Sequence, residues 1–181
     1  MIDIGVNLTN SQLLSKAQEV LDRARTAGVQ HCVITGTDLE SSQQAVKLCE
    51  ELESDFPGML SCTAGVHPHD AKDWNTDSAD LFTDLLKHPS VVAVGETGLD
   101  FNRNYSPKDL QILAFEAQIE LAVESKKPLF LHERDAFEKE YEILQYYRDS
   151  ISDAVVHCFT GDKQSLFSYL DLDLHIGITG W

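Results

Sequence analysis

Cysteine is scarce in this sequence, and its few copies are never closely paired. The four cysteines lie far apart along the chain: Cys32, Cys49, Cys62 and Cys158. Because no C-x-x-C pair is present, a zinc site built from thiolates is disfavoured. Three of the four lie in or beside apolar, strand-like runs, so we expect free thiols that are mostly buried.

Long hydrophobic runs are absent as well. No apolar stretch approaches the length of a membrane span, and the opening MIDIGVNLTN has neither the basic segment nor the apolar core of a signal peptide. We therefore expect a cytoplasmic protein with no membrane partner. Since no Gly/Ser-rich linker or low-complexity segment interrupts the chain, we expect one domain over residues 1–181.

Basic residues are few relative to acidic ones. The chain carries 14 Lys and Arg against 30 Asp and Glu, a formal net charge of −16. A protein that coats nucleic acid should be basic, so this balance argues against that class. It argues less against an enzyme that takes one strand end, because bound cations can supply local positive charge.

What the sequence does contain is an alternation of strand-like and helix-like runs. A helical face is predicted from Leu13 to Ala24, with Gly28 placed to stop it. Another helix start is predicted at Ser106–Asp109, with Ser106 as the cap. The predicted strands are Ile2–Val6, His31–Thr35, Leu60–Val66, Val91–Gly95, Pro128–His132, Ala154–His157 and Leu172–Ile178.

This alternation indicates a parallel sheet covered by helices. A complete (β/α)₈ TIM barrel needs typically ~250 residues, and this chain has seven strand signals in 181 residues. The barrel interpretation therefore predicts an incomplete barrel with about seven of eight strands, lacking its C-terminal part. An open doubly wound sheet also fits, but no G-x-G-x-x-G follows the first strand.

Polar side chains of metal-ligand type follow several of these strands. They are Asn7, His67, Glu96, His132 and His157. A barrel gathers the carboxyl ends of its strands at one face, where active sites lie, so this pattern favours the barrel. Two imidazoles and a carboxylate suit Zn²⁺, Mn²⁺ or Fe²⁺, and with added water Mg²⁺. His67 is a further ligand candidate or a group that faces phosphate.

The neighbouring loops carry candidates for substrate binding. Arg103 is expected to hold a phosphate or to pair with Asp100, and Arg134 to meet a phosphate or Glu96. Asp135 is a candidate cap for the next helix. His69 is expected on the surface, and Asp38 is expected to cap the helix after the second strand.

Seven motifs together resemble the TatD-type metal-dependent hydrolases. These are DIGVNLT, ITGT, TAGVHPHD, VAVGETGLDFNRN, LHERDA, VVHCFTG and IGITGW, in order along the whole chain. The resemblance implies a TIM barrel with divalent metals at the strand ends and 3′–5′ exonuclease activity on DNA or, in some members, RNA. By the same resemblance, Glu96, His132 and His157 match metal ligands, and His67 matches a position near the site.

The chain departs from the family pattern at two places. Gly5 and Asn7 stand where many members carry an H-x-H pair, which predicts one weaker or absent metal position. The E-T-D-A-P segment of the eighth strand, whose aspartate is thought to help activate water, has no counterpart. The resemblance therefore leaves the activity of this chain open.

The sequence thus predicts a metal-dependent phosphodiester hydrolase that uses a metal-activated water, with single-stranded nucleic acid as its partner. Glu96 and His67 are the predicted catalytic residues, and Arg103 and Arg134 the predicted substrate-binding residues. Mg²⁺ or Mn²⁺ is the expected cofactor, with Zn²⁺ as the alternative. Rival hypotheses are an aminoacyl-ester or amide hydrolase and an inactive metal-binding fragment. The oligomeric state stays open, with a monomer expected for a full-length form.

Overall fold

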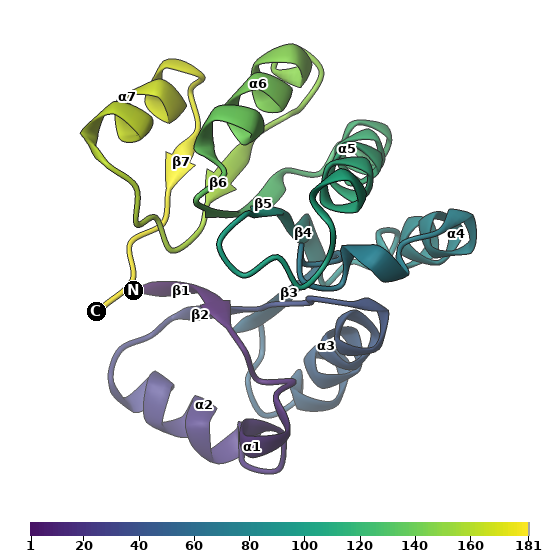
Figure 1. The fold of residues 1–181 in the computed structure, drawn as a ribbon. Coiled ribbons are helices and arrows are strands. Elements are labelled where there is room, and N and C mark those ends of the chain that lie inside the picture. Colours follow the sequence, from purple (N-terminus) through teal and green to yellow (C-terminus); the bar gives the residue numbers. More distant parts are fainter. Residues whose placement is uncertain (181) are drawn as a thin grey trace.

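Seven parallel strands form one sheet in the order of the sequence, from β1 to β7 (Figure 1). The computed structural model describes residues 1–180, so Trp181, the last residue of the IGITGW motif, lies outside the described part. The sheet curls into part of a barrel, which confirms the predicted fold class (Figure 1). The strands are β1 (Ile2–Val6), β2 (His31–Ile34), β3 (Leu60–Ala64), β4 (Val91–Asp100), β5 (Leu129–Arg134), β6 (Ala154–Val156) and β7 (His175–Ile176).

Helices connect successive strands and lie outside the curled sheet (Figure 1). Parallel strands require such crossovers, because a tight turn cannot bring the chain back to the same end. The elements are α1 (Ser11–Leu14), α2 (Ala17–Thr26), α3 (Leu39–Leu52), the 3₁₀ turn η1 (Ala71–Asp73), α4 (Thr76–Leu85), α5 (Lys108–Ser125), α6 (Phe137–Tyr147) and α7 (Lys163–Asp171). None of the helices within residues 1–180 is long and apolar enough to cross a membrane.

Three of the predicted helix signals can be compared with the structure directly. Gly28, at φ 87°, follows the end of α2 and so confirms the predicted stop. Asp38 caps α3 as predicted, because its Oδ1 accepts from the backbone N–H of Ser41 at 2.7 Å. The helical face predicted from Leu13 to Ala24 is divided, since α1 ends at Leu14 and α2 begins at Ala17.

Two predicted caps are wrong. Pro107 occupies the cap position of α5, and the Ser106 hydroxyl instead donates to the carbonyl of His69 at 2.7 Å. Ala136 precedes α6, and the Asp135 carboxylate accepts from the Asn102 amide at 2.6 Å. Both side chains therefore join loops at the carboxyl face of the sheet and do not cap helices.

The core lies between the sheet and its helices. Its fully buried large side chains include Leu21, Ile34, Phe115, Leu129 and Leu131, and their transfer out of water supplies the main driving force for folding. All four cysteines are free, and three of them are buried, as the sequence predicts.

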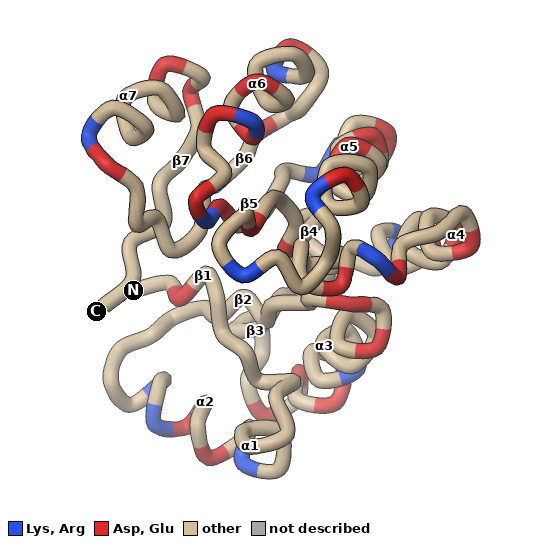
Figure 2. Tube along the Cα trace, in the orientation of Figure 1, with Lys and Arg blue, Asp and Glu red and all other residues tan. Residues whose placement is uncertain are grey.

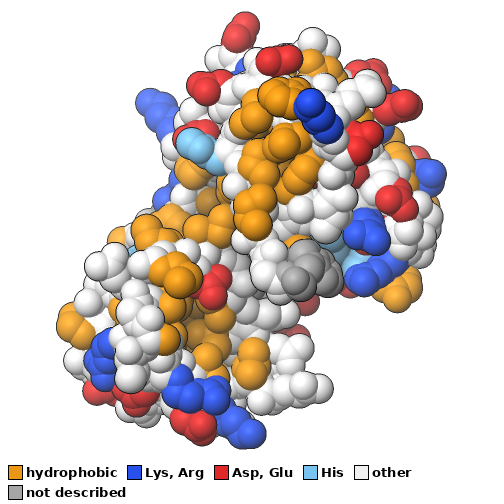
Figure 3. Space-filling model, turned by 90° about the vertical axis from the view of Figure 1, so that its left-hand side faces the viewer, with side chains coloured by type: hydrophobic (Ala, Val, Ile, Leu, Met, Phe, Trp, Pro, Cys, Tyr) orange, Lys and Arg blue, Asp and Glu red, His pale blue; other side chains and the backbone are white. Residues whose placement is uncertain are grey.

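A groove of about 800 Å³ separates the two outer strands, β1 and β7, and is lined by residues from both. Among the described strands, β1 pairs with β2 and β7 with β6. Figure 3 faces this side and shows hydrophobic side chains gathered on it. Ile2 and Ile178, which line the groove, are 60% and 82% exposed.

Candidate metal centre

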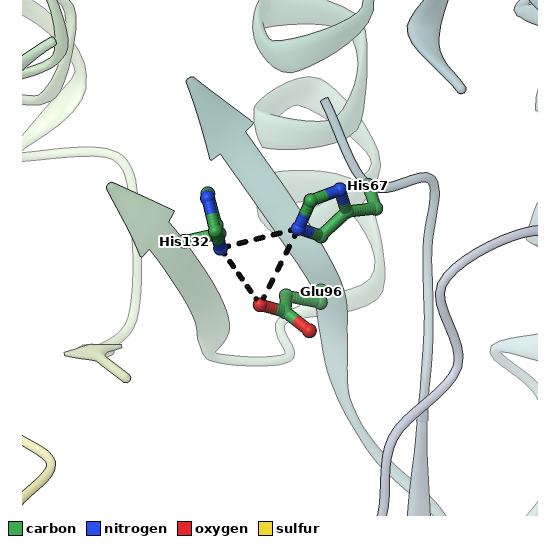
Figure 4. Close-up of side chains that lie close together, drawn as sticks. All are labelled: His67, Glu96 and His132. Atoms are coloured by element: carbon green, nitrogen blue, oxygen red, sulfur yellow. Dashed lines mark hydrogen bonds and ion pairs between the residues drawn. The ribbon is translucent and has the colours of Figure 1, made fainter. Parts of the chain in front are cut away.

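Three consecutive strands bring together the side chains of a candidate metal site. His67 follows β3, Glu96 lies within β4 and His132 within β5. The His132 Nδ1 lies 3.1 Å from His67 Nε2 and 3.0 Å from Glu96 Oε1, and the remaining pair is 3.7 Å apart (Figure 4). The three side chains therefore converge, and one ligand atom from each lies within 4.8 Å of the other two.

The backbone holds two of these residues firmly. The N–H of His67 donates to the carbonyl of Thr37 at 2.8 Å, and the N–H of Glu96 donates to that of Gly36 at 2.7 Å. Both acceptors belong to the turn after β2, so this turn supports the cluster from an earlier unit of the chain.

The ionisation of the cluster follows from its burial. Burial lowers the pKa of His67 to about 3, so its imidazole is neutral at pH 7. Burial alone would raise the pKa of Glu96, but the hydrogen bond with His132 and the nearby imidazoles outweigh it and lower that pKa. Neutral imidazole and ionised carboxylate are the forms that bind a metal.

Asp100 and His69 form a pair that lies beside the His132 ring. His69 Nε2 lies 2.7 Å from Asp100 Oδ2, and that oxygen lies 3.5 Å from His132 Nε2. The prediction that His69 is a surface residue is wrong, because its side chain is only 19% exposed and faces the site. Asp100 is 1% exposed, and the backbone N–H of Arg103 holds its carboxylate at 2.8 Å. Burial opposes ionisation here too, yet these hydrogen bonds lower the pKa of Asp100.

These donors fit a divalent cation. Ligand atoms around a tetrahedral ion at ~2.1 Å lie about 3.4 Å from one another, and the three separations in the cluster are 3.0, 3.1 and 3.7 Å. Two imidazoles and a carboxylate suit Mn²⁺ or Zn²⁺, and Mg²⁺ with added water.

His157 lies beside this cluster. Its ring stacks on Phe130 at 4.7 Å between centroids, and burial lowers its pKa. It lines the same pocket as Glu96, but the group of atoms within 4.8 Å contains His67 in its place. Gly5 leaves room for it, since a Cβ there would lie 2.7 Å from the His157 ring. Its predicted ligand role stays a prediction.

The cluster opens into a pocket of about 330 Å³. Arg103 and Arg134, the two arginines predicted to bind substrate, both line it. Arg134 donates to the Thr160 hydroxyl at 3.2 Å, whereas Arg103 meets Asp100 through its backbone N–H. Figure 2 shows how acidic residues dominate the surrounding helices. The two guanidinium groups therefore provide cationic positions beside the cluster of a strongly acidic chain.

Comparison with known proteins assigns the chain to a family. The TatD related DNase family matches residues 2–181. The chain belongs to the TatD family. Two relatives named 3′-5′ ssDNA/RNA exonuclease TatD, from Salmonella typhimurium and Edwardsiella piscicida, are 47% and 49% identical over 181 residues. These matches cover 100% of this chain and 68% of each relative.

Solved TatD structures share the fold. The TatD homolog YJJV from Escherichia coli superposes with a TM-score of 0.87 at 26% identity, covering 97% of this chain and 66% of that one. A TatD family hydrolase from Entamoeba histolytica gives 0.90 at 27% identity, with coverages of 98% and 64%. This chain therefore spans about two thirds of the length of the relatives it matches.

Sequence reasoning missed two supporting residues of this TatD site, Gln111 and Gln118. Both lie on α5 and are 1% exposed. The Gln118 amide accepts from the N–H of Val66 at 2.7 Å and donates to its carbonyl at 3.0 Å. Gln111 holds both backbone groups of Asp100 in the same way, at 2.8 and 3.1 Å. Their signal was two glutamines seven residues apart on a buried helical face.

Proposed function

We propose that this TatD family member is a metal-dependent phosphodiester hydrolase that removes nucleotides from the 3′ end of single-stranded DNA or RNA. The observation that carries the proposal is the convergence of His67, Glu96 and His132 on one point beside two arginines. The names of the relatives, which specify 3′-5′ exonuclease action on single-stranded DNA and RNA, support the substrate and the polarity.

The residues of the pocket take distinct roles in this proposal. Glu96 and His132 hold the cation together with His67, and His157 is the additional ligand predicted from the sequence. Arg103 and Arg134 orient the phosphate, because a planar guanidinium can donate two parallel hydrogen bonds to its oxygens. A divalent cation bound there would lower the pKa of a water molecule and polarise a phosphoryl oxygen.

Glu96 and His67 keep their predicted catalytic roles in the proposal. Because its lowered pKa keeps Glu96 ionised at pH 7, the carboxylate oxygen that does not hold the cation can accept a proton from a water in the pocket. His67, whose pKa is about 3, would act as a neutral imidazole that holds the cation. Mg²⁺ or Mn²⁺ is the proposed cation. The cytoplasmic location and the monomeric full-length form predicted from the sequence are also part of this proposal.

The test uses single-stranded DNA labelled at its 5′ end, with Mg²⁺ or Mn²⁺ and with a chelator as control. We expect stepwise shortening that the chelator abolishes and that a blocked 3′ end prevents. His132→Ala should remove most of the rate, since it deletes a ligand. The matched control is His175→Ala, whose side chain is 70% exposed and pairs with Asp153 away from the pocket.

Three results would count against the proposal. Cleavage that survives the chelator would exclude the metal, and shortening from the 5′ end would exclude the polarity. Hydrolysis of an aminoacyl ester with DNA left intact would instead support the rival ester hydrolase.

A further inference from the structure

Four aromatic rings form a continuous row from the metal cluster to the surface. His132 packs against His67 at 4.3 Å between ring centroids, His67 against His69 at 4.2 Å, and His69 against Tyr105 at 4.7 Å. Each contact is edge-to-face, with interplanar angles of 65° to 73°. The three histidines belong to the site described above, whereas Tyr105 has no role in it so far.

Tyr105 is exposed but not loosely held. Tyr105 is 63% exposed, while the next residue, Ser106, is fully buried. Ser106 donates to the carbonyl of His69 at 2.7 Å and accepts from the N–H of Lys72 at 3.1 Å. These bonds join the loop after β4 to the loop after β3, so the Tyr105 ring is presented to solvent from a braced position.

The surroundings of Tyr105 indicate what it can bind. Arg103 lies two residues earlier in the same loop and lines the pocket beside the cluster. An exposed aromatic face next to a guanidinium is the combination that binds single-stranded nucleic acid, because the ring stacks on a base while the cation meets the backbone. In a duplex the bases already stack on one another, so such a face favours an unpaired end.

We propose that Tyr105 is a stacking platform for a nucleobase that adjoins the cleaved phosphodiester. The proposal rests on the proposed nuclease function and adds to it a base-recognition position. Every base has a π-face, so the platform discriminates little among sequences. It selects instead for unpaired bases and sets the distance between the stacked base and the cluster.

The experiment compares three variants on two substrates. Tyr105→Leu removes the ring and keeps an apolar side chain, Tyr105→Phe keeps the ring, and Tyr146→Leu is the control, since Tyr146 is 83% exposed on α6 outside the pocket lining. The substrates are a single-stranded oligonucleotide and the same strand with abasic sites at its two 3′-terminal positions.

With the normal substrate, we expect Tyr105→Leu to raise KM about 5- to 150-fold, the range for one lost base stack. Tyr105→Phe and Tyr146→Leu should match the unchanged protein, and all three should bind Mn²⁺ as the unchanged protein does. With the abasic substrate, Tyr105→Leu and the unchanged protein should have the same KM, because no base is present to stack.

The platform is refuted if Tyr105→Leu leaves KM unchanged, or if its loss is the same on both substrates. A weakened Mn²⁺ affinity in Tyr105→Leu would also refute it, since the ring would then support the cluster. Failure of the nuclease proposal gives a different result, namely no hydrolysis by the unchanged protein. In that case fluorescence anisotropy of the two labelled oligonucleotides, with the same variants, still decides whether the ring stacks a base.

Discussion

Among single residues, Glu140 has the least expected environment. It is fully buried, its Oε2 accepts from the N–H of Leu99 at 3.1 Å, and its Oε1 has no hydrogen-bond partner within residues 1–180. Burial, and then the nearby Glu133, raise its pKa well above the ordinary 4.5. The folded state therefore binds the proton more tightly than the unfolded chain does, and stability falls as pH rises above 4.5.

This environment predicts that Glu140→Gln, which cannot ionise and can still accept from Leu99, is stabilising at high pH. Urea unfolding at pH 8 should give a higher midpoint for the variant than for the unchanged protein. The difference should shrink toward pH 4, where the unfolded glutamate also binds its proton. A difference of the same size at both pH values would contradict the assignment of a raised pKa.

Single substitutions can also show how much each histidine contributes to cation binding. We expect His67→Ala to weaken Mn²⁺ binding, measured by calorimetry, more than His157→Ala does, because His67 Nε2 lies 3.1 Å from the His132 ligand atom while His157 stacks on Phe130. The loss should exceed the about 10- to 100-fold typical of residues outside the ligand shell. Equal losses in both variants would show that His157 contributes as much to cation binding as His67 does.

Among the elements, α5 supports the site through its two buried glutamines. Gln118→Met should leave the N–H and carbonyl of Val66 without partners, at a cost of about 1–3 kcal/mol for each buried group. Because His67 follows Val66 directly, Mn²⁺ affinity should fall together with the free energy of unfolding. Gln145→Met, at an exposed position on α6, is the matched control. A loss of stability with unchanged Mn²⁺ affinity would mean that the helix does not position His67.

The strand β4 shows where sequence patterns stop being informative. Five strands were located to within two residues at each end, since buried apolar runs between helices predict parallel strands. The seventh was expected over Leu172–Ile178, but Leu172 is the C-cap of α7 and β7 spans only His175–Ile176. The fourth, β4, was expected to end at Gly95 and continues to Asp100. Gly98 permits this extension: it has φ 138°, and a Cβ there would lie 2.0 Å from the His132 carbonyl oxygen. Glycine usually signals a break, and only the approach of β5 makes it a requirement here.

Only part of the candidate site could be predicted from the sequence, because some of its features are local in the chain and others are not. Positions at strand ends are visible in the sequence, so His67, Glu96 and His132 could be selected from the pattern of apolar runs. Hydrogen bonds between distant segments are not visible there. The pairing of His69 with Asp100, and the positions of Gln111 and Gln118, follow from how α5 and the loops pack on the sheet.

At the scale of the whole molecule, charge predicts a weak dependence of DNA binding on salt. The chain has a net charge of −16, and the pocket offers two arginines to phosphates. With two phosphate contacts, the slope of log affinity against log salt for a single strand should be about −1.4. Arg103→Ala and Arg134→Ala should each reduce its magnitude by about 0.7, measured by anisotropy at fixed Mg²⁺.

Lys47→Ala is the control for these charge variants, because Lys47 is exposed on α3 and pairs with Glu51. It should leave the slope unchanged. A steep slope in the unchanged protein, or an equal effect of all three substitutions, would indicate binding through the general field of the molecule and not through the pocket.

The order of the strands has a consequence for protein synthesis. Each strand pairs with the one made just before it, from β1 to β7, so no strand has to wait for a distant partner to leave the ribosome. The candidate cation site draws on three consecutive strands and the loops after them, with His67 after β3, Glu96 in β4 and His132 in β5. The last of these strands, β5, ends at Arg134. This three-residue cluster can therefore assemble on the growing chain before β6 and β7 have joined the sheet. A cation that binds to it early would favour the folded form of the nascent half-barrel by mass action.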